Sequence, residues 1–337
     1  AYNVDGKGLS TTDMRKLGGA SIHDYDVNFK DFEEGCDYPY TRAVHFYERY
    51  EEYLDMMKEL GLNAFRTSIS WSRIFPNGDD LEPNEVGLKY YEDLVDAMRA
   101  RGMEPLMTLT HFELPLALAQ KYGGWGSREL INIYLRYCEV LFKRLKGKVK
   151  YWISFNEINN SVIFPFWILG IDTRNSANPK QDLYQAIHHV FVANALSVKL
   201  LHEIDPDAKL GDMTSVSTIY PNSCNPTEVF EAYRLRRLKY FFKDVPVLGY
   251  YPHQMKRYFK ENNIVIAPSK AVNAGGVAVS GLEMSQNSMR YTWTAEEVEE
   301  KLHQIMINIF KNSCEAAKKY GMEGDLVAGA NIFGFEK

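Results

Sequence analysis

The chain has 337 residues, 45% of them hydrophobic and 25% charged, with a formal net charge of −5 and a pI of about 6.0. This balance is typical of a globular protein and argues against nucleic acid or an anionic membrane as its partner. No apolar stretch reaches the roughly 18 residues that a membrane span needs, and the amino-terminal segment has no signal-peptide pattern, so a cytoplasmic protein is predicted. The cysteines form no CxxC pair and no His cluster has metal-ligand spacing, so neither a metal site nor a cofactor is expected.

Strands and helices are predicted to alternate along the first 262 residues. Apolar residues at helical spacing predict helices, and runs rich in aromatic and β-branched residues predict strands. In chain order these are helix 45–60, strand 61–71, helix 83–102, strand 103–112, helix 127–147, strand 149–159, helix 182–204, strand 208–220 and helices 226–242 and 252–262. Apolar strands alternating with amphipathic helices indicate a parallel sheet covered by helices, which is an α/β fold.

The composition changes near residue 265, where the chain becomes rich in Gly, Ala, Ser and Asn. A helix is predicted over 294–321, since Thr294 with Glu297 three residues later forms a capping box and Gly321 ends the helix. We therefore expect two parts, residues 1–264 and a mainly helical segment 265–337.

Polar and aromatic side chains collect where the predicted strands end, and no G-x-G-x-x-G follows the first strands. These residues are Arg66, Trp71, His111, Asn156 and Glu157. A barrel of parallel strands keeps its active site at this end. Glu157 is a candidate general acid/base for cleaving a glycosidic bond, which usually needs two carboxylates. On this short motif alone, a strand-end glutamate in a structural salt bridge is the favoured interpretation.

The other strand-end residues allow two interpretations as well. His111 and Asn156 have side chains that can hydrogen-bond a sugar hydroxyl, and the guanidinium of Arg66 can orient a carboxylate through two hydrogen bonds. Trp71 and Trp125 have faces on which a sugar can stack, but tryptophan is commonly part of the core.

Five segments resemble glycoside hydrolase family 1 in the order and spacing of that family. They are FRTSISWSRIFPNGDDLEPNEVGLKYYEDLVD (65–96), TLTHFELPLALAQKYGGW (108–125), KYWISFNEINN (150–160), YPNSCNP (220–226) and DVPVLGYYP (244–252). HFELP and YPNSCNP resemble the 6-phospho-β-glucosidase branch. The resemblance, over about 1–263, implies a TIM barrel with Glu157 as acid/base, His111 and Asn156 as sugar ligands, and Arg66 holding the nucleophile.

The chain also departs from the family pattern. Only strands two to five of a (β/α)8 barrel can be recognised, and Tyr53 stands where the family has an Asp. The family's Glu-Asn-Gly nucleophile motif and its phosphate-binding loop have no counterpart, so the nucleophile is unknown. Glu283, in GLEMS, is the only glutamate of the tail that a strand-like segment precedes, which makes it the one candidate substitute.

From about residue 265 the chain resembles the carboxy-terminal part of an NADP-type glutamate dehydrogenase. That resemblance implies that Asn273 lies by a nicotinamide and that Ser280 helps to hold a substrate, but the family's catalytic lysine has no counterpart here.

The sequence thus predicts a retaining 6-phospho-β-glucosidase that hydrolyses phosphorylated β-glucosides, impaired by its missing nucleophile. Two alternatives stay open from the first part of the chain: a composite or chimeric chain without turnover, and a half-barrel completed by a partner chain or a second copy. A glutamate dehydrogenase fragment is the alternative from the second part.

Overall fold

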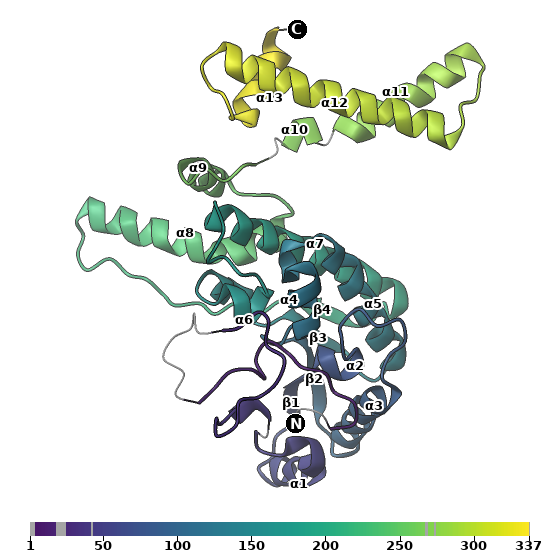
Figure 1. Cartoon of the computed structure of the whole chain (residues 1–337), viewed down its shortest axis with the longest axis vertical. Coiled ribbons are helices and arrows are strands. Elements are labelled where there is room, and N and C mark those ends of the chain that lie inside the picture. Colours follow the sequence, from purple (N-terminus) through teal and green to yellow (C-terminus); the bar gives the residue numbers. More distant parts are fainter. Residues whose placement is uncertain (1–3, 18–24, 42, 267–268, 273, 337) are drawn as a thin grey trace. The chain divides into compact units, whose positions relative to one another are not determined.

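The computed structural model describes residues 4–17, 25–41, 43–266, 269–272 and 274–336. It divides into two compact units, Ala1–Pro252 and His253–Lys337, which are described separately below (Figure 1). The boundary expected from composition, at 264/265, falls twelve residues further along the chain, after the first helix of the second unit.

The first unit contains a four-stranded parallel sheet in the order β1-β2-β3-β4. The strands are β1 (Ala64–Ser68), β2 (Glu104–Thr110), β3 (Tyr151–Phe155) and β4 (Lys209–Gly211). The α/β class and the parallel sheet predicted from the sequence are confirmed. The fourth strand is much shorter than the predicted range 208–220, because the chain leaves the sheet after Gly211.

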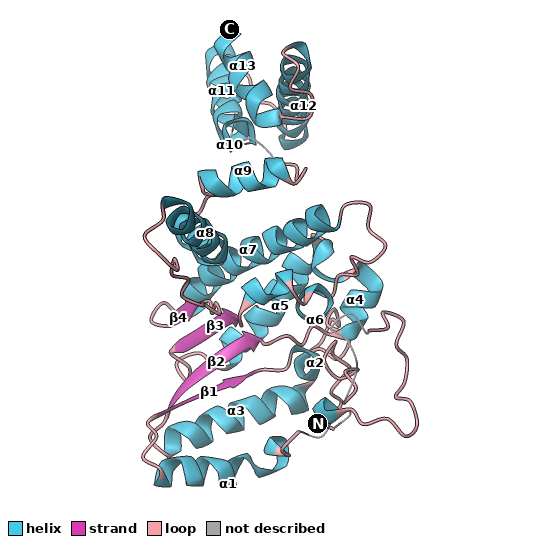
Figure 2. Cartoon of the chain, turned by 90° about the vertical axis from the view of Figure 1, so that its left-hand side faces the viewer, coloured by secondary structure: helices cyan, strands magenta, loops and turns pink. Residues whose placement is uncertain are grey.

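Helices lie between successive strands and pack beside the sheet (Figure 2). They are α1 (Phe46–Glu59), α2 (Trp71–Ile74), α3 (Glu85–Ala100), α4 (Leu116–Tyr122), α5 (Glu129–Arg144), α6 (Pro165–Leu169), α7 (Pro179–Ile204) and α8 (Pro226–Leu248), with short 3-10 helices η1 (Pro39–Thr41), η2 (Gly124–Gly126) and η3 (Ile158–Val162). The predicted long helices are present within a few residues of their expected bounds, except that α8 runs six residues further. The short helices α2, α4 and α6 were not predicted.

The core of this unit is aromatic and lies between the sheet and its helices. Trp71 stacks on Tyr137 with ring centroids 4.9 Å apart, and Trp125 packs edge-on against Phe155 at 5.6 Å. Met107 and Leu109 of β2 are fully buried on the sheet itself. Burial of these large apolar faces drives the helices onto the strands.

The amino-terminal segment 7–13, called the strap below, lies along the loops that follow β1 and β2. Ser10 forms an isolated antiparallel bridge with Pro115, and the Gly8 amide donates to the Ser72 carbonyl over 2.9 Å. A buried ion pair between Lys7 and Asp13, 2.6 Å apart, closes the strap on itself. Residues far apart in sequence are thereby fixed at one end of the sheet.

The described residues of the second unit form helices. These are α9 (His253–Glu261), α10 (Ser269–Val272), α11 (Ala274–Met289), α12 (Ala295–Lys319) and α13 (Leu326–Glu336). The predicted capping box starts α12, since the Thr294 amide donates to the Glu297 carboxylate over 2.7 Å and the Glu297 amide donates to the Thr294 hydroxyl over 3.3 Å. Helix α12 packs against α11 and α13.

Candidate active site

The candidate site lies at the carboxyl ends of β1, β2 and β3. Arg66 projects from β1, His111 follows β2, and Asn156 and Glu157 follow β3. Because the strands are parallel, their carboxyl ends lie together at one end of the sheet. The backbone N–H of Asn156 also donates to the Thr110 carbonyl over 3.0 Å, which extends the pairing of β2 and β3 to the start of the site.

Arg66 and Asn156 form the floor of the site. The Arg66 Nη2 donates to Asn156 Oδ1 over 2.5 Å, and its Nε donates to the Thr108 hydroxyl over 3.0 Å. The Asn156 side chain is buried, so its amide is held in one orientation. The role implied for Arg66, holding a nucleophile, stays a prediction, because its described contacts are to Asn156 and Thr108.

Glu157 has an unusual backbone for a residue other than glycine. Its φ of 43° and ψ of 46° place it in the left-handed region, at the first turn of η3. Such backbone carries strain and is found where surrounding contacts hold a functional side chain. Here the backbone N–H of Asn160 donates to the Glu157 backbone carbonyl over 2.9 Å. The side-chain amide of Asn160 donates to Glu157 Oε2, also over 2.9 Å.

Asn160 was missed in the sequence as a site residue. It is the last residue of the segment KYWISFNEINN, three positions after Glu157. In a 3-10 turn, residues three apart lie on the same side of the helix, so this spacing was the signal that could have identified it.

His111 lies beside both charged groups of the site. Its Nδ1 is 3.0 Å from the Ser68 hydroxyl. Partial burial lowers the pKa of His111, and the positive charge of Arg66 lowers it further, while the negative charge of Glu157 opposes both. The imidazole is therefore neutral at pH 7 and suited to exchange hydrogen bonds with a hydroxyl group.

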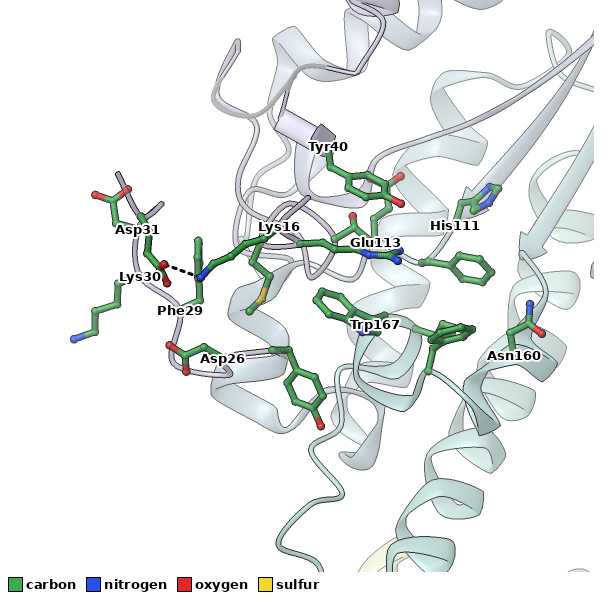
Figure 3. Close-up of a pocket in the computed structure, with 18 of the residues that line it drawn as sticks. Lys16, Asp26, Phe29, Lys30, Asp31, Tyr40, His111, Glu113, Asn160 and Trp167 are labelled. Atoms are coloured by element: carbon green, nitrogen blue, oxygen red, sulfur yellow. Dashed lines mark hydrogen bonds and ion pairs between the residues drawn. The ribbon is translucent and has the colours of Figure 1, made fainter. Parts of the chain in front are cut away.

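A cavity of about 900 Å³ opens beside these residues. Figure 3 shows His111 and Asn160 at one side of the cavity, with Trp167 and Glu113 between them and the amino-terminal residues. Aromatic rings supply much of the wall: Tyr25, Phe29, Tyr40, Phe112, Phe164 and Trp167. The Lys16 ammonium, also in the wall, forms a 2.6 Å ion pair with Glu33.

The carboxyl group of Glu113, which was not singled out in the sequence, also lines this cavity. Burial raises the pKa of Glu113 to about 7, with Asp13 adding to the rise and Lys7 opposing it. The strap therefore brings two charged residues close to Glu113. Its position two residues after His111, in HFELP, was the available signal.

The two tryptophans do not belong to the site. Trp71 is fully buried and Trp125 is 2% exposed, so neither presents a ring face to a sugar. The expectation that they stack on a sugar is therefore wrong. Only Trp71 was expected at a strand end, and in the structure both rings pack in the aromatic core.

The candidate residues of the second unit that the structure describes, Ser280 and Glu283, are both exposed on α11. Ser280 is exposed on α11, where its hydroxyl donates to the Gly276 carbonyl over 3.3 Å. Glu283 is exposed in the middle of the same helix, so the idea of a strand-like approach is wrong. Asn273 lies outside the described residues. The dehydrogenase resemblance stays a prediction.

The described residues bear on two other kinds of site, a metal site and a membrane-spanning helix. They contain no group of three or more His, Cys, Asp or Glu side chains placed to hold a metal ion. None of their helices is long and apolar enough to cross a membrane.

Comparison with known proteins identifies relatives for most of the chain. A family model described as glycosyl hydrolase family 1 matches residues 1–309. Aryl-phospho-beta-D-glucosidase BglH of Bacillus subtilis is 46% identical over 266 residues, which is 79% of this chain and 55% of that protein. Phospho-cellobiase of Klebsiella oxytoca is 38% identical over 330 residues, covering 96% of this chain and 68% of that protein.

A solved structure agrees with these matches. The virulence factor SghA of Agrobacterium tumefaciens superposes with a TM-score of 0.64 at 29% identity, over 79% of this chain and 56% of that chain. The chain thus spans a little over half the length of several relatives that it matches. The family match also continues to residue 309, past the junction near 265 at which a second resemblance was inferred.

Proposed function

The chain belongs to glycosyl hydrolase family 1, and on this premise we propose that it carries the acid/base side of a retaining 6-phospho-β-glucosidase site. The observation that carries the proposal is the placement of Glu157. It follows the third strand on a strained backbone, its carboxylate is held by Asn160, and His111, Asn156 and Arg66 surround it. The names of the relatives, an aryl-phospho-β-D-glucosidase and a phospho-cellobiase, support a phosphorylated β-glucoside as substrate.

In this proposal Glu157 gives its proton to the glycosidic oxygen while the bond to the sugar breaks. It then takes a proton from the water that completes hydrolysis. His111 and Asn156 hold sugar hydroxyls, and Arg66 fixes the orientation of the Asn156 amide through the 2.5 Å hydrogen bond.

The cavity is proposed as the subsite of the leaving group. It adjoins Asn160, which contacts Glu157, and its wall combines aromatic rings with a few charged side chains. Aromatic walls bind flat rings by stacking and by burial of apolar area, so an aryl leaving group fits this lining.

A retaining mechanism needs a second carboxylate about 5–5.5 Å from the first. This nucleophile is not identified among the described residues, and in the described sheet β1 and β4 each pair on one side only. The proposal therefore includes completion of the barrel by a partner chain or a second copy. A molar mass of the purified protein in solution well above 38.8 kDa supports that part.

The test is hydrolysis of 4-nitrophenyl β-D-glucoside 6-phosphate by the unmutated chain and by Glu157→Gln. We expect turnover that falls at least about 100-fold in Glu157→Gln, the usual weight of a general acid/base. Glu283→Gln is the matched control and leaves the rate unchanged, since Glu283 is exposed on α11. Absence of turnover, or equal rates for Glu157→Gln and the unmutated chain, contradicts the proposal, and a preference for the unphosphorylated glucoside contradicts its phosphate specificity.

A further inference from the structure

Asn160 stands between the Glu157 carboxylate and the cavity. Its side-chain amide donates to Glu157 Oε2 over 2.9 Å, and the residue also lines the cavity beside His111 (Figure 3). Both side chains are half-buried, so the bond is partly shielded from competing water. Its backbone amide, bonded to the Glu157 carbonyl, holds the same turn closed.

The neighbouring asparagine has a different role. Asn159 is bonded in both directions to Ser215, with its Nδ2 donating to the Ser215 carbonyl and its Oδ1 accepting from the Ser215 amide, each over 2.9 Å. It ties the loop after β3 to the segment after β4. Of the two adjacent asparagines, Asn159 holds the two loops together and Asn160 contacts Glu157.

We propose that Asn160 is the positioning residue of Glu157, and that it selects which carboxyl oxygen carries the transferable proton. The inference rests on the proposed function. An amide N–H can only donate, so Oε2 must accept in both protonation states of Glu157. A carbonyl oxygen accepts a hydrogen bond more strongly than a hydroxyl oxygen, so this bond favours the acid form that carries its proton on Oε1. It passes from Oε1 to the glycosidic oxygen as the bond to the sugar breaks, and the bonding electron pair leaves with the neutral alcohol.

This role makes a specific demand on the leaving group. A poor leaving group such as an alkyl alcohol or phenol needs the proton as the bond breaks, whereas 2,4-dinitrophenolate departs without it. Loss of the Asn160 amide therefore slows hydrolysis of the first kind of substrate and spares the second. A merely structural defect slows both to the same extent.

The first experiment compares kcat/KM of Asn160→Ala and Asn159→Ala on the phenyl and 2,4-dinitrophenyl β-glucoside 6-phosphates. For Asn160→Ala we expect a loss of about 10-fold or more on the phenyl substrate and less than about 3-fold on the dinitrophenyl substrate, part of the full general-acid effect. For Asn159→Ala the ratio of the two substrates stays that of the unmutated chain. An equal loss on both substrates in Asn160→Ala overturns the proposal.

The second experiment does not depend on turnover. Asparagine side chains are labelled with ¹⁵N, and the amide resonances of Asn160 and Asn159 are assigned by their loss in the two alanine variants. Glu157→Gln is expected to shift the Asn160 side-chain resonances and leave those of Asn159 in place. Unmoved Asn160 resonances overturn the inference, whereas a shift without any turnover contradicts only the proposed hydrolase function.

Discussion

Arg66 and Asn156, ninety residues apart in the sequence, are joined by a 2.5 Å hydrogen bond across the ends of β1 and β3. The bond fixes the guanidinium beside His111, where its positive charge acts on the imidazole. The negative charge of Glu157 acts on the same ring with the opposite sign. The pKa of His111 therefore depends on two opposing charges, those of Arg66 and Glu157.

Two substitutions test this balance by moving the pKa of His111 in opposite directions. Arg66→Gln removes the positive charge and raises the pKa, although burial, the largest cause of its lowering, remains. Glu157→Gln removes the opposing negative charge and lowers the pKa further. The measurement is the NMR titration of the His111 ring in the three proteins, and shifts of the same sign in both variants contradict the arrangement.

Glu113 is expected to make the chain less stable as the pH rises. Its pKa is about 7 in the folded protein against an ordinary value of 4.5, so the folded state binds more protons between these two pH values. The free energy of unfolding therefore falls by up to about 3 kcal/mol as the pH rises from about 4.5 to above 7.

Urea unfolding of the unmutated chain and of Glu113→Gln at pH 4.5 and pH 8 measures this contribution. The variant lacks the titrating group. Its free energy of unfolding, relative to that of the unmutated chain, is therefore expected to be higher at pH 8 than at pH 4.5. Glu82→Gln, at an exposed position, is the control. A difference that is the same at both pH values shows that Glu113 titrates normally.

The buried ion pair of the strap gives a prediction about stability. Lys7→Met leaves the Asp13 carboxylate buried without its cation and is expected to cost about 3–5 kcal/mol. Lys16→Met breaks the exposed pair with Glu33 and is expected to cost less than about 1 kcal/mol. Thermal and urea unfolding of the two variants compare them directly, and equal losses count against a structural role for the strap.

Gly124 is required by its backbone and by its surroundings. Its φ is +59°, and a Cβ atom there would lie 2.2 Å from the Leu169 carbonyl oxygen. Gly124→Ala should therefore cost more than about 2 kcal/mol of unfolding free energy. At Gly126 the nearest atom to an added Cβ is Ile171 Cγ2 at 3.6 Å, an ordinary contact. Gly126→Ala is the matched control, and similar denaturation midpoints for the two variants contradict the prediction.

The sequence predicted the sheet and part of the site because both depend on local patterns. Apolar runs separated by helical periodicity identify parallel strands, and the carboxyl ends of such strands necessarily lie together. Arg66, His111, Asn156 and Glu157 were found for this reason. Their placement follows from chain order alone and needs no knowledge of side-chain packing.

What the sequence could not predict depends on contacts between distant segments. The strap brings Lys7 and Asp13 to Glu113, and no periodicity reports such a contact. A tryptophan at a strand end is equally compatible with the core and with a sugar site, so only packing decided Trp71. The predicted strand 208–220 continues well past the end of β4 at Gly211, because apolar residues follow after the chain has left the sheet.

The order β1-β2-β3-β4 has a consequence for protein synthesis. Each strand is a neighbour of the one made just before it, so a nascent chain leaving the ribosome always offers the next strand a ready partner. Arg66, His111 and Glu157 can come together once the first three strands have emerged, and β2, β3 and β4 each find the strand they pair with already made. The ends of β1, β2 and β3, where these side chains lie, can therefore come together before β4 has been made.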